Sequence, residues 1–204
     1  MYVPPHYRAE GEDLEAFIRA AEFGQLVHVT RDGAPWVTHL PVVCEQRDGQ
    51  WWVETHLARA NPQAKDVEDS PVLVVLPGPH AYVSPVWYTV DEVPTWNYLA
   101  VHLRGRAERL EGEAFRQSLA RLVARHERDR PGGRELEDYD PEMIQPKLRA
   151  AVGLRIRVER LDGAFKLSQE QEAAGRERVA AALDEQGGEA AELARAMRKN
   201  TPAD

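Results

Sequence analysis

The hydrophobic pattern of the first third of the chain predicts one amphipathic helix followed by antiparallel strands. Residues 25–30 and 36–43 read as strands joined through Asp32-Gly33, a dipeptide that suits a tight hairpin. A second Asp-Gly pair, at 48–49, leads into an aromatic strand at 51–55. The helix precedes them, because apolar residues recur at helical spacing at Leu14, Phe17, Ile18 and Ala21.

The middle of the chain continues the sheet. Asn61 and Pro62 fit the N-cap and first position of a helix that follows the strand ending near residue 56. Residues 71–77 form a wholly apolar run, which is typical of a strand buried on both faces, and residues 80–84 are expected to extend it. The alternation resumes at residues 96–106, which predicts a further strand.

Helical periodicity dominates the segment that follows. Residues 113–128 carry one apolar stripe on a charged helix, and we expect this stripe to dock on the barrel. A polar segment with Pro131 and two glycines is expected to be a loop. A short helix should start after Asp140 and be interrupted by Pro146, because proline lacks the backbone N–H that a helix needs.

The last third predicts two more strands and a tail. Residues 152–159 alternate as a strand, and Asp162-Gly163 is expected to turn it into residues 164–169. Beyond residue 170 the composition shifts to Ala, Glu and Arg, which indicates a helical, partly frayed tail. We therefore predict a mainly β, antiparallel barrel domain with peripheral helices over residues 1–170, and a helical C-terminal tail over residues 171–204.

Composition narrows the class of protein. The chain has 204 residues and a net charge of -8, and its pI is about 5.4, so a strong electrostatic grip on DNA by one protomer is not favoured. The single cysteine, Cys44, follows an apolar run and is expected to be buried and inert. The start of the chain lacks the pattern of a secretion signal, and no apolar run could span a bilayer, so we expect a soluble cytoplasmic protein.

An aromatic stretch at residues 78–98 points to a binding surface. It holds two tryptophans and three tyrosines, although the whole chain is only 7% aromatic. From composition alone, rings that complete a core are about as plausible as rings that line a pocket. Together with other segments this stretch resembles the PaiB-like family of FMN-binding negative transcriptional regulators, through the blocks MYVPPHYR, HLARANPQ, GPHAYVSPVWY, VPTWNYLAVH and GAFKLSQ.

The resemblance covers roughly residues 1–170 and implies a fold, a cofactor and an assembly. Proteins of this family adopt the FMN-binding split-barrel fold, an antiparallel split β-barrel, and pair as homodimers with a flavin site at each end of the interface. FMN presents a phosphate, a ribityl chain and a flat apolar ring, so a site for it needs features matched to each. Split-barrel relatives also bind haem or other planar ligands, so the cofactor follows from the resemblance alone.

The phosphate candidates lie in the HLARANPQ block and just after it. Arg59 offers a forked set of donors and Lys65 a point charge, and the helix that starts near Asn61 is expected to present free backbone N–H groups. Without the resemblance, solvated surface side chains would be the better interpretation of Arg59 and Lys65.

The ring candidates come from two segments. Strand Thr38-His39-Leu40 resembles the family segment that runs under the flavin, although His39 could equally pack within the sheet. In the aromatic stretch Trp87 and Trp96 could wall the ring, with the Asn97 amide on its edge, or a tryptophan could belong to the core.

A late block is expected to reach the site from the partner subunit. It contains Lys166, Ser168 and Gln169. The family usually continues with Asn-Arg after that glutamine, whereas this chain has Glu170-Gln171, which removes a positive charge and puts a contact from those two positions in doubt.

Three functions follow from these patterns. The first is a flavin-binding transcriptional regulator or sensor, and the second is a flavin-dependent oxidoreductase that uses NAD(P)H with an unknown small acceptor. The third is direct DNA recognition, which is doubtful because no basic recognition helix is visible and its only support is a possible stripe of Arg149, Arg155, Arg157 and Arg160. The scattered histidines form no zinc pattern, and a hydrolytic triad of Ser84, His80 and Asp91 lacks a nucleophile elbow.

Overall fold

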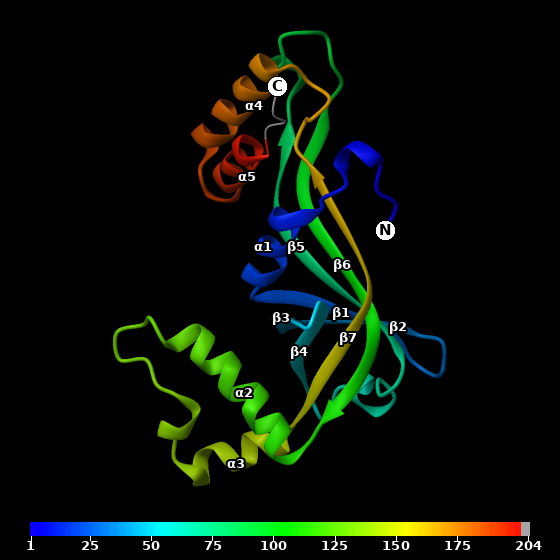
Figure 1. Cartoon of the computed structure of the whole chain (residues 1–204), viewed down its shortest axis with the longest axis vertical. Coiled ribbons are helices and arrows are strands. Elements are labelled where there is room, and N and C mark those ends of the chain that lie inside the picture. The colour runs from blue at the N-terminus through cyan, green and yellow to red at the C-terminus, as the bar shows by residue number, and fades with distance from the viewer. Residues whose placement is uncertain (201–204) are drawn as a thin grey trace. The chain divides into compact units, whose positions relative to one another are not determined.

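Seven strands and five α-helices make up the computed structural model over residues 1–200, which are the residues it describes (Figure 1). The strands form one sheet in the order β2-β1-β5-β6-β7-β4-β3, and the predicted mainly β, antiparallel split-barrel fold with peripheral helices is confirmed. The strands are β1 Phe23–Val29, β2 Pro35–Pro41, β3 Val43–Arg47, β4 Gln50–Ala58, β5 Pro71–Val83, β6 Thr95–Leu110 and β7 Ala151–Lys166. The helices are α1 Gly11–Ala20, α2 Gly112–Glu127, α3 Pro141–Arg149, α4 Ala173–Gln186 and α5 Gly188–Lys199.

The chain divides into two compact units. The barrel unit comprises Glu15–Leu76 and His102–Leu161, and the tail unit comprises Met1–Leu14, Pro77–Val101 and the segment from Asp162 onward. Strands β5, β6 and β7 contribute residues to both. The domain boundary expected at residue 170 falls inside the tail unit and stays a prediction.

Two of the three expected Asp-Gly turns are confirmed. Gly33 has a φ of 84° and its N–H bonds to the carbonyl of Thr30, which closes the β1–β2 hairpin. Asp48 and Gly49 have φ values of 50° and 78°, so both central residues of the β3–β4 turn adopt the left-handed conformation that this hairpin requires.

The third expected turn, Asp162-Gly163, is wrong: β7 runs straight through it as one strand. Gly163 allows a close approach here instead of a reversal. An added Cβ would lie 2.7 Å from Leu14 Cδ1 and 3.0 Å from Ala9 Cβ, and the Gly163 carbonyl accepts a bond from the Ala9 N–H. The N-terminal segment therefore packs on β7 at the position where the pattern predicted a loop.

The sheet of the barrel unit encloses an apolar core. Only Val42 separates β2 from β3, and the Thr55 hydroxyl of β4 donates to the Pro41 carbonyl at 2.6 Å, which brings the two ends of the sheet order together. Alternate residues of the strands point inward, as the period of two predicts. Core side chains with at most 2% exposure include Leu26, Leu40, Val42, Val53, Leu57, Val74, Leu76, Leu103, Leu154 and Ile156.

Helix α2 docks on the barrel through its first half. Phe115 and Ser118 are buried, whereas the later members of the predicted stripe, such as Leu122, are only half-buried. Glu54 of β4 supplies the polar part of this contact, because its buried carboxylate pairs with Arg121 of α2. The expected docking is thus confirmed for Phe115 and incomplete beyond it.

Pro146 does not interrupt α3, so that expectation is also wrong. The helix runs from Pro141 to Arg149, with the Asp140 side chain accepting from the Glu142 N–H at its start. Proline removes only its own N–H bond, and the last turn still closes because the Ala150 N–H bonds to the Pro146 carbonyl.

The tail unit ends in a packed pair of helices (Figure 1). Val179 and Leu183 of α4 and Leu193 of α5 are fully buried, and Arg176 donates to the Met197 carbonyl at the end of α5. Between the two helices the chain turns at Gly187 and Gly188, both of which have positive φ. The last four residues of the predicted tail lie outside the described residues.

Over residues 1–200, the helices are too short or too polar for any of them to span a membrane. Cys44 is buried as expected, and burial raises the pKa of its thiol to about 12.

Candidate functional site

The twelve predicted site residues divide equally between the two units. Six of them belong to the barrel unit: Thr38, His39, Leu40, Arg59, Asn61 and Lys65. The other six belong to the tail unit: Trp87, Trp96, Asn97, Lys166, Ser168 and Gln169.

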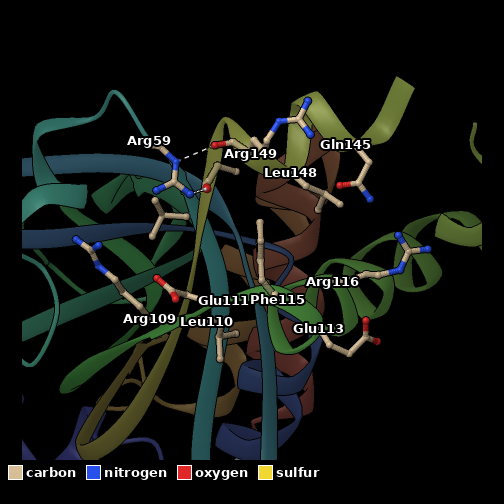
Figure 2. A pocket seen from close by; sticks show the side chains of 13 residues that line it. Arg59, Arg109, Leu110, Glu111, Glu113, Phe115, Arg116, Gln145, Leu148 and Arg149 are labelled. Atoms are coloured by element: carbon tan, nitrogen blue, oxygen red, sulfur yellow. Dashed lines mark hydrogen bonds between the residues drawn. The ribbon is translucent and has the colours of Figure 1, made fainter. Parts of the chain in front are cut away.

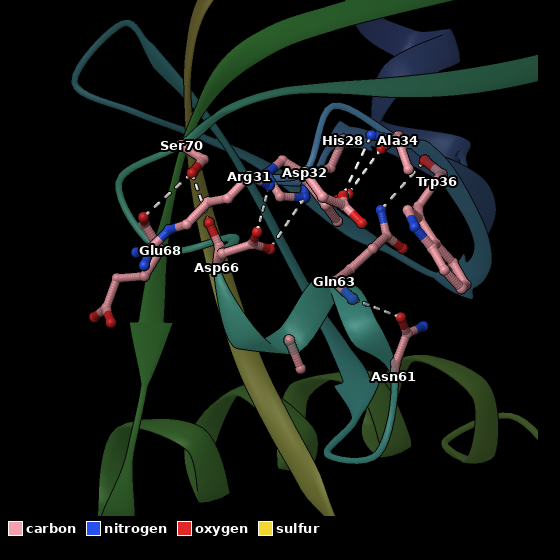
Figure 3. A network of polar contacts seen from close by, with 12 residues as sticks. His28, Arg31, Asp32, Ala34, Trp36, Asn61, Gln63, Asp66, Glu68 and Ser70 are labelled. Carbon is pink, nitrogen blue, oxygen red and sulfur yellow. Dashed lines mark hydrogen bonds and ion pairs between the residues drawn. The ribbon is translucent and has the colours of Figure 1, made fainter.

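A buried glutamine, Gln63, bonds to two residues of the first set, Thr38 and Asn61 (Figure 3). Gln63 is 0% exposed, and its amide donates to the carbonyls of Leu26 and Trp36, both at 3.3 Å. Its side-chain oxygen accepts from the Thr38 hydroxyl, and Asn61 Nδ2 donates to that same hydroxyl at 2.8 Å. Gln63 thus ties the turn after β4 to strands β1 and β2. Sequence reasoning missed it, although it lies in the HLARANPQ block.

The start of the short helix offers less to a phosphate than expected. Asn61 caps it and Pro62 opens it, as predicted, but it is a 3-10 helix of four residues, Pro62–Lys65. The Gln63 N–H bonds to the Asn61 side chain at 2.9 Å, and the Ala64 N–H bonds to the Asn61 carbonyl at 2.9 Å. The expectation of free backbone donors is therefore wrong, and the exposed ammonium of Lys65 is the remaining cation of this turn.

The Arg59 side chain bonds to the junction between α3 and β7, and not to the Asn61 turn (Figure 2). Its Nε donates to the Arg149 carbonyl at 2.7 Å and its Nη2 to the Ala151 carbonyl at 3.0 Å. The Arg59 backbone N–H also bonds to the Ala150 carbonyl at 2.7 Å. The guanidinium thus closes the junction between α3 and β7, and its predicted phosphate role stays a prediction.

Strand β2 presents an open aromatic face. His39 is exposed and stacks on Phe23, with ring centroids 6.4 Å apart and planes at 23°. Trp36 is 39% exposed but lies on the other face of β2, because successive side chains of a strand alternate between its faces. Leu40 is buried, so only its main chain could meet a ligand. In the sheet order of the described residues β2 comes first, so one of its edges has no strand neighbour.

The tail unit has its own aromatic face. Trp96 is 54% exposed and lies edge-on to Tyr82, with ring centroids 6.1 Å apart. His80 lies on the same strand as Tyr82, and its ring centroid is 6.1 Å from that of Trp96. The His80 Nδ1 is 2.9 Å from a Glu189 carboxylate oxygen. Trp87 is half-buried in the short 3-10 helix Pro85–Trp87. Trp96 can therefore meet a planar partner without rearrangement.

Asn97 and Ser168 lie inside the tail unit. Both are 0% exposed, and Asn97 Nδ2 donates to Ser168 Oγ at 2.9 Å. The Tyr88 hydroxyl is also 2.9 Å from Ser168 Oγ, and Asn97 Nδ2 is 3.7 Å from the sulfur of Met197 in α5. Burial raises the pKa of Tyr88, although the Ser168 hydrogen bond lowers it in part. These side chains hold the helical tail to the sheet, and their predicted flavin contacts stay predictions.

Lys166 and Gln169 lie at the end of β7. Lys166 Nζ bonds to the Thr95 hydroxyl and lies 5.7 Å from the ring centroid of Tyr7. Gln169 folds back on its own strand, accepting from the Leu167 N–H at 2.7 Å and donating to the Phe165 carbonyl. Burial first, and then the negative charge of Glu170, raise the pKa of Tyr7 to about 12. Glu170, one of the two residues that depart from the family pattern, therefore lies beside Tyr7.

The chain can be placed by comparison with known proteins. Residues 1–160 match a family described as "Putative FMN-binding domain". The protease synthase and sporulation protein PAI 2 of Bacillus subtilis is 36% identical over 171 residues, which cover 83% of this chain and 82% of that protein.

Solved structures resemble this chain in fold. An FAD- and haem-binding protein of Mycobacterium smegmatis superposes with a TM-score of 0.61 at 16% identity, over 89% of this chain and 80% of that one. A 5-nitroimidazole antibiotic resistance protein of Bacteroides thetaiotaomicron, named as putative, gives a TM-score of 0.56 at 16% identity, over 76% and 84% of the two chains. At such identities the likeness concerns the fold alone.

Proposed function

This chain belongs to the FMN-binding, PaiB-like family that its sequence resembles. From that premise we propose that it is a flavin-dependent transcriptional regulator or sensor that acts without binding DNA directly. The observation that carries the proposal is the family match over residues 1–160, which includes the whole barrel unit except its last residue. FMN, when bound, supplies redox chemistry at its ring.

The open face of the barrel unit fits FMN. Its ring needs flat apolar contacts, and the stacked pair of His39 and Phe23 lies exposed on neighbouring strands. Its phosphate needs a cation, and the exposed Lys65 ends the turn that Gln63 fixes to β2. In this proposal Lys65 binds the phosphate and the β2 residues hold the ring.

A homodimer would cover the remaining aromatic surface. The tail unit leaves Val86 74% exposed and Val93 71% exposed, in the same stretch as Trp96 and Tyr82. Large exposed apolar residues that gather in one stretch of chain often belong to an interface. We therefore propose that a second copy of the chain covers this stretch and that the flavin sites lie at the interface.

Electrostatics support indirect regulation. The chain carries a net charge of -8, and two of the four arginines of the stripe proposed for DNA lie beside carboxylates. Arg155 pairs with the buried Glu54 at 3.0 Å, and Arg157 lies 3.7 Å from Glu159. Cations that contact phosphates dominate DNA affinity. These two arginines are already beside carboxylates, so β7 offers few cations to a DNA backbone.

The proposal is tested by titrating FMN into the purified full chain and following flavin fluorescence. We expect saturable binding that Lys65→Ala weakens about tenfold, since one charge-assisted contact to phosphate is lost. Lys147→Ala, which removes an exposed lysine of α3 in the same unit, is the matched control and should bind FMN as the unaltered chain does. Equal FMN affinities of Lys65→Ala and Lys147→Ala would contradict the assignment of Lys65.

The DNA part of the proposal has its own test. The anisotropy of a labelled random-sequence duplex, read at low salt with and without FMN, should not rise as protein is added. Tight, salt-dependent binding to the duplex would show that the chain contacts DNA directly.

A further inference from the structure

A cavity lies in the barrel unit, where β6 ends and β7 begins, and helices α2 and α3 contribute to its lining (Figure 2). Its volume is about 420 Å³, within the range typical of small-molecule sites. Of the predicted flavin residues, Arg59 lines it, whereas Thr38, His39 and Lys65 do not. The cavity is therefore a different place from the open face of β2.

The floor of the cavity is apolar. Phe115 of α2 and Leu148 of α3 face each other across it, with Leu110 and Val152 at the ends of β6 and β7 (Figure 2). Phe115 is held in place because Gly153 of β7 leaves room for its ring: a Cβ at Gly153 would lie 2.3 Å from Phe115 Cδ2. This floor can receive a hydrocarbon or aromatic group.

The rim is cationic, which is unusual in so acidic a chain. Within the described residues, four arginines line the cavity against two glutamates, Glu111 and Glu113. The arginines are Arg59, Arg109, Arg116 and Arg149. The six lining side chains sum to +2, but Glu68 and Glu137 offset Arg109 and Arg116 from outside the lining, so the guanidinium donors of Arg59 and Arg149 are what favours an anionic ligand.

Two of these arginines are suited to hold an anion. Arg59 uses Nε and Nη2 on carbonyls of the α3–β7 junction, which fixes its guanidinium and leaves Nη1 as a donor. The Arg149 side chain is exposed and projects from α3 on the same rim as the Gln145 amide (Figure 2). Arg109 and Arg116 already pair with Glu68 and Glu137, each at 3.5 Å, and are less available to a ligand.

The start of α2 adds to the same field. This helix of 16 residues begins at Gly112, and its N-cap, Glu111, makes no side-chain cap bond. Gly112 and Glu113 line the cavity, so the positive end of the helix dipole lies at its edge.

We propose that this cavity binds a small organic acid with an apolar body, its hydrocarbon or aromatic part on Phe115 and Leu148 and its carboxylate on Arg149, Arg59 and Gln145. The apolar floor requires the body, and the cationic rim requires the negative charge. The ligand would tie α3 to the end of the barrel, beside the junction that Arg59 closes.

The test uses para-trifluoromethylbenzoate as the probe and fluorine NMR as the readout, on the full chain with and without saturating FMN. Para-trifluoromethylbenzylamine carries the same ring with a positive charge. Inorganic phosphate carries a negative charge without the ring, and its affinity is read from its displacement of the fluorinated acid. We expect the acid to bind more tightly than the amine or phosphate, and its affinity to be unchanged by FMN.

Two charge reversals on one helix provide the matched variants. Arg149→Glu should weaken binding of the acid about tenfold or more, because a favourable contact becomes repulsive. Lys147→Glu makes the same kind of change in the same last turn of α3 but at a residue that does not line the cavity, so its affinity should stay within about twofold. The circular dichroism of both variants should match that of the unaltered chain.

Several results would overturn the proposal. Equal binding of acid and amine would remove the role of the cationic rim, and phosphate binding as tight as that of the acid would remove the role of the apolar floor. Equal losses in Arg149→Glu and Lys147→Glu would place the probe elsewhere. Displacement of the acid by FMN would assign the cavity to the flavin site, whereas failure of FMN to bind at all would count against the proposed function and not against this cavity.

Discussion

Replacing Glu54 by glutamine should loosen α2 from the barrel sheet. The Glu54 side chain is 3% exposed and its carboxylate is shared by three guanidinium groups. Arg155 of β7 donates to it at 3.0 Å and Arg47 of β3 lies at 3.4 Å, while Arg121 of α2 pairs with its other oxygen. One carboxylate therefore connects two neighbouring strands and a helix.

The expected cost follows from this geometry. Removing one partner of a buried ion pair typically costs 3–5 kcal/mol, because the remaining charge is left uncompensated. Here the three arginines are about one-quarter to two-fifths exposed, so water offsets part of the loss. We expect Glu54→Gln to lower the free energy of unfolding by ~3 kcal/mol, which corresponds to roughly 6–12 °C in Tm for a chain of this size.

Glu45→Gln is the matched control. Glu45 belongs to the strand paired with β4 and contacts Arg47 at 2.7 Å, but its side chain is partly exposed. An exposed pair contributes little, so its loss should cost about 0.5 kcal/mol. Urea unfolding at neutral pH, followed by circular dichroism, measures both variants.

The pH dependence gives a second readout of the same cluster. Burial alone would raise the pKa of Glu54, but hydrogen bonds from Arg121 and Ser118 outweigh it and lower the pKa in the folded state. The unfolded chain therefore takes up the proton first as pH falls, and the stabilisation by Glu54 is complete above about pH 4.3 and is lost below it. The stability difference between the unaltered chain and Glu54→Gln should shrink in this acidic range. Equal stabilities of Glu54→Gln and Glu45→Gln at neutral pH would refute the reasoning.

Three further predictions concern single residues. Burial raises the pKa of Cys44 to about 12, so an aromatic disulfide reagent should not modify this thiol in the native chain near neutral pH. The reagent should modify it after unfolding in guanidinium, and rapid reaction in the native chain would contradict its burial. Gly105→Ala should destabilise the chain by ~3 kcal/mol in urea unfolding, because the new Cβ would lie 2.0 Å from the Arg157 carbonyl oxygen, whereas an unchanged midpoint would mean that the strands part easily. Tyr88→Phe should cost ~1 kcal/mol by the same assay, since Ser168 loses one of its two buried partners, and no loss would show that the hydroxyl contributes nothing there.

Much of the fold could be predicted from short-range pattern. The hairpins at Asp32-Gly33 and Asp48-Gly49 depend on backbone angles that the dipeptide itself favours. The same dipeptide at 162–163 led to a wrong prediction of a turn. Gly163 is needed there for the packing of Ala9 and Leu14, and these residues are far away in sequence. Pattern cannot distinguish a glycine required for a turn from a glycine required for a close approach.

The candidate site was harder to predict for the same reason. Asn61 was correctly placed as a helix cap, but whether its neighbouring N–H groups are free depends on the length of the helix that follows. Arg59 was chosen for its charge, while its direction is set by the carbonyls of the α3–β7 junction some 90 residues later. Gln63 is a single polar residue, so no periodicity in the sequence predicts that it is buried. Only the folded chain shows that it joins three segments.

The most direct test of the account is to identify any flavin carried by the natively purified chain. The visible spectrum is recorded first, and the protein is then denatured so that released flavin can be identified by chromatography. We expect a flavin spectrum and the release of FMN, or full loading when the flavin-free chain is incubated with FMN. A chain that carries no flavin and takes up none would contradict FMN binding.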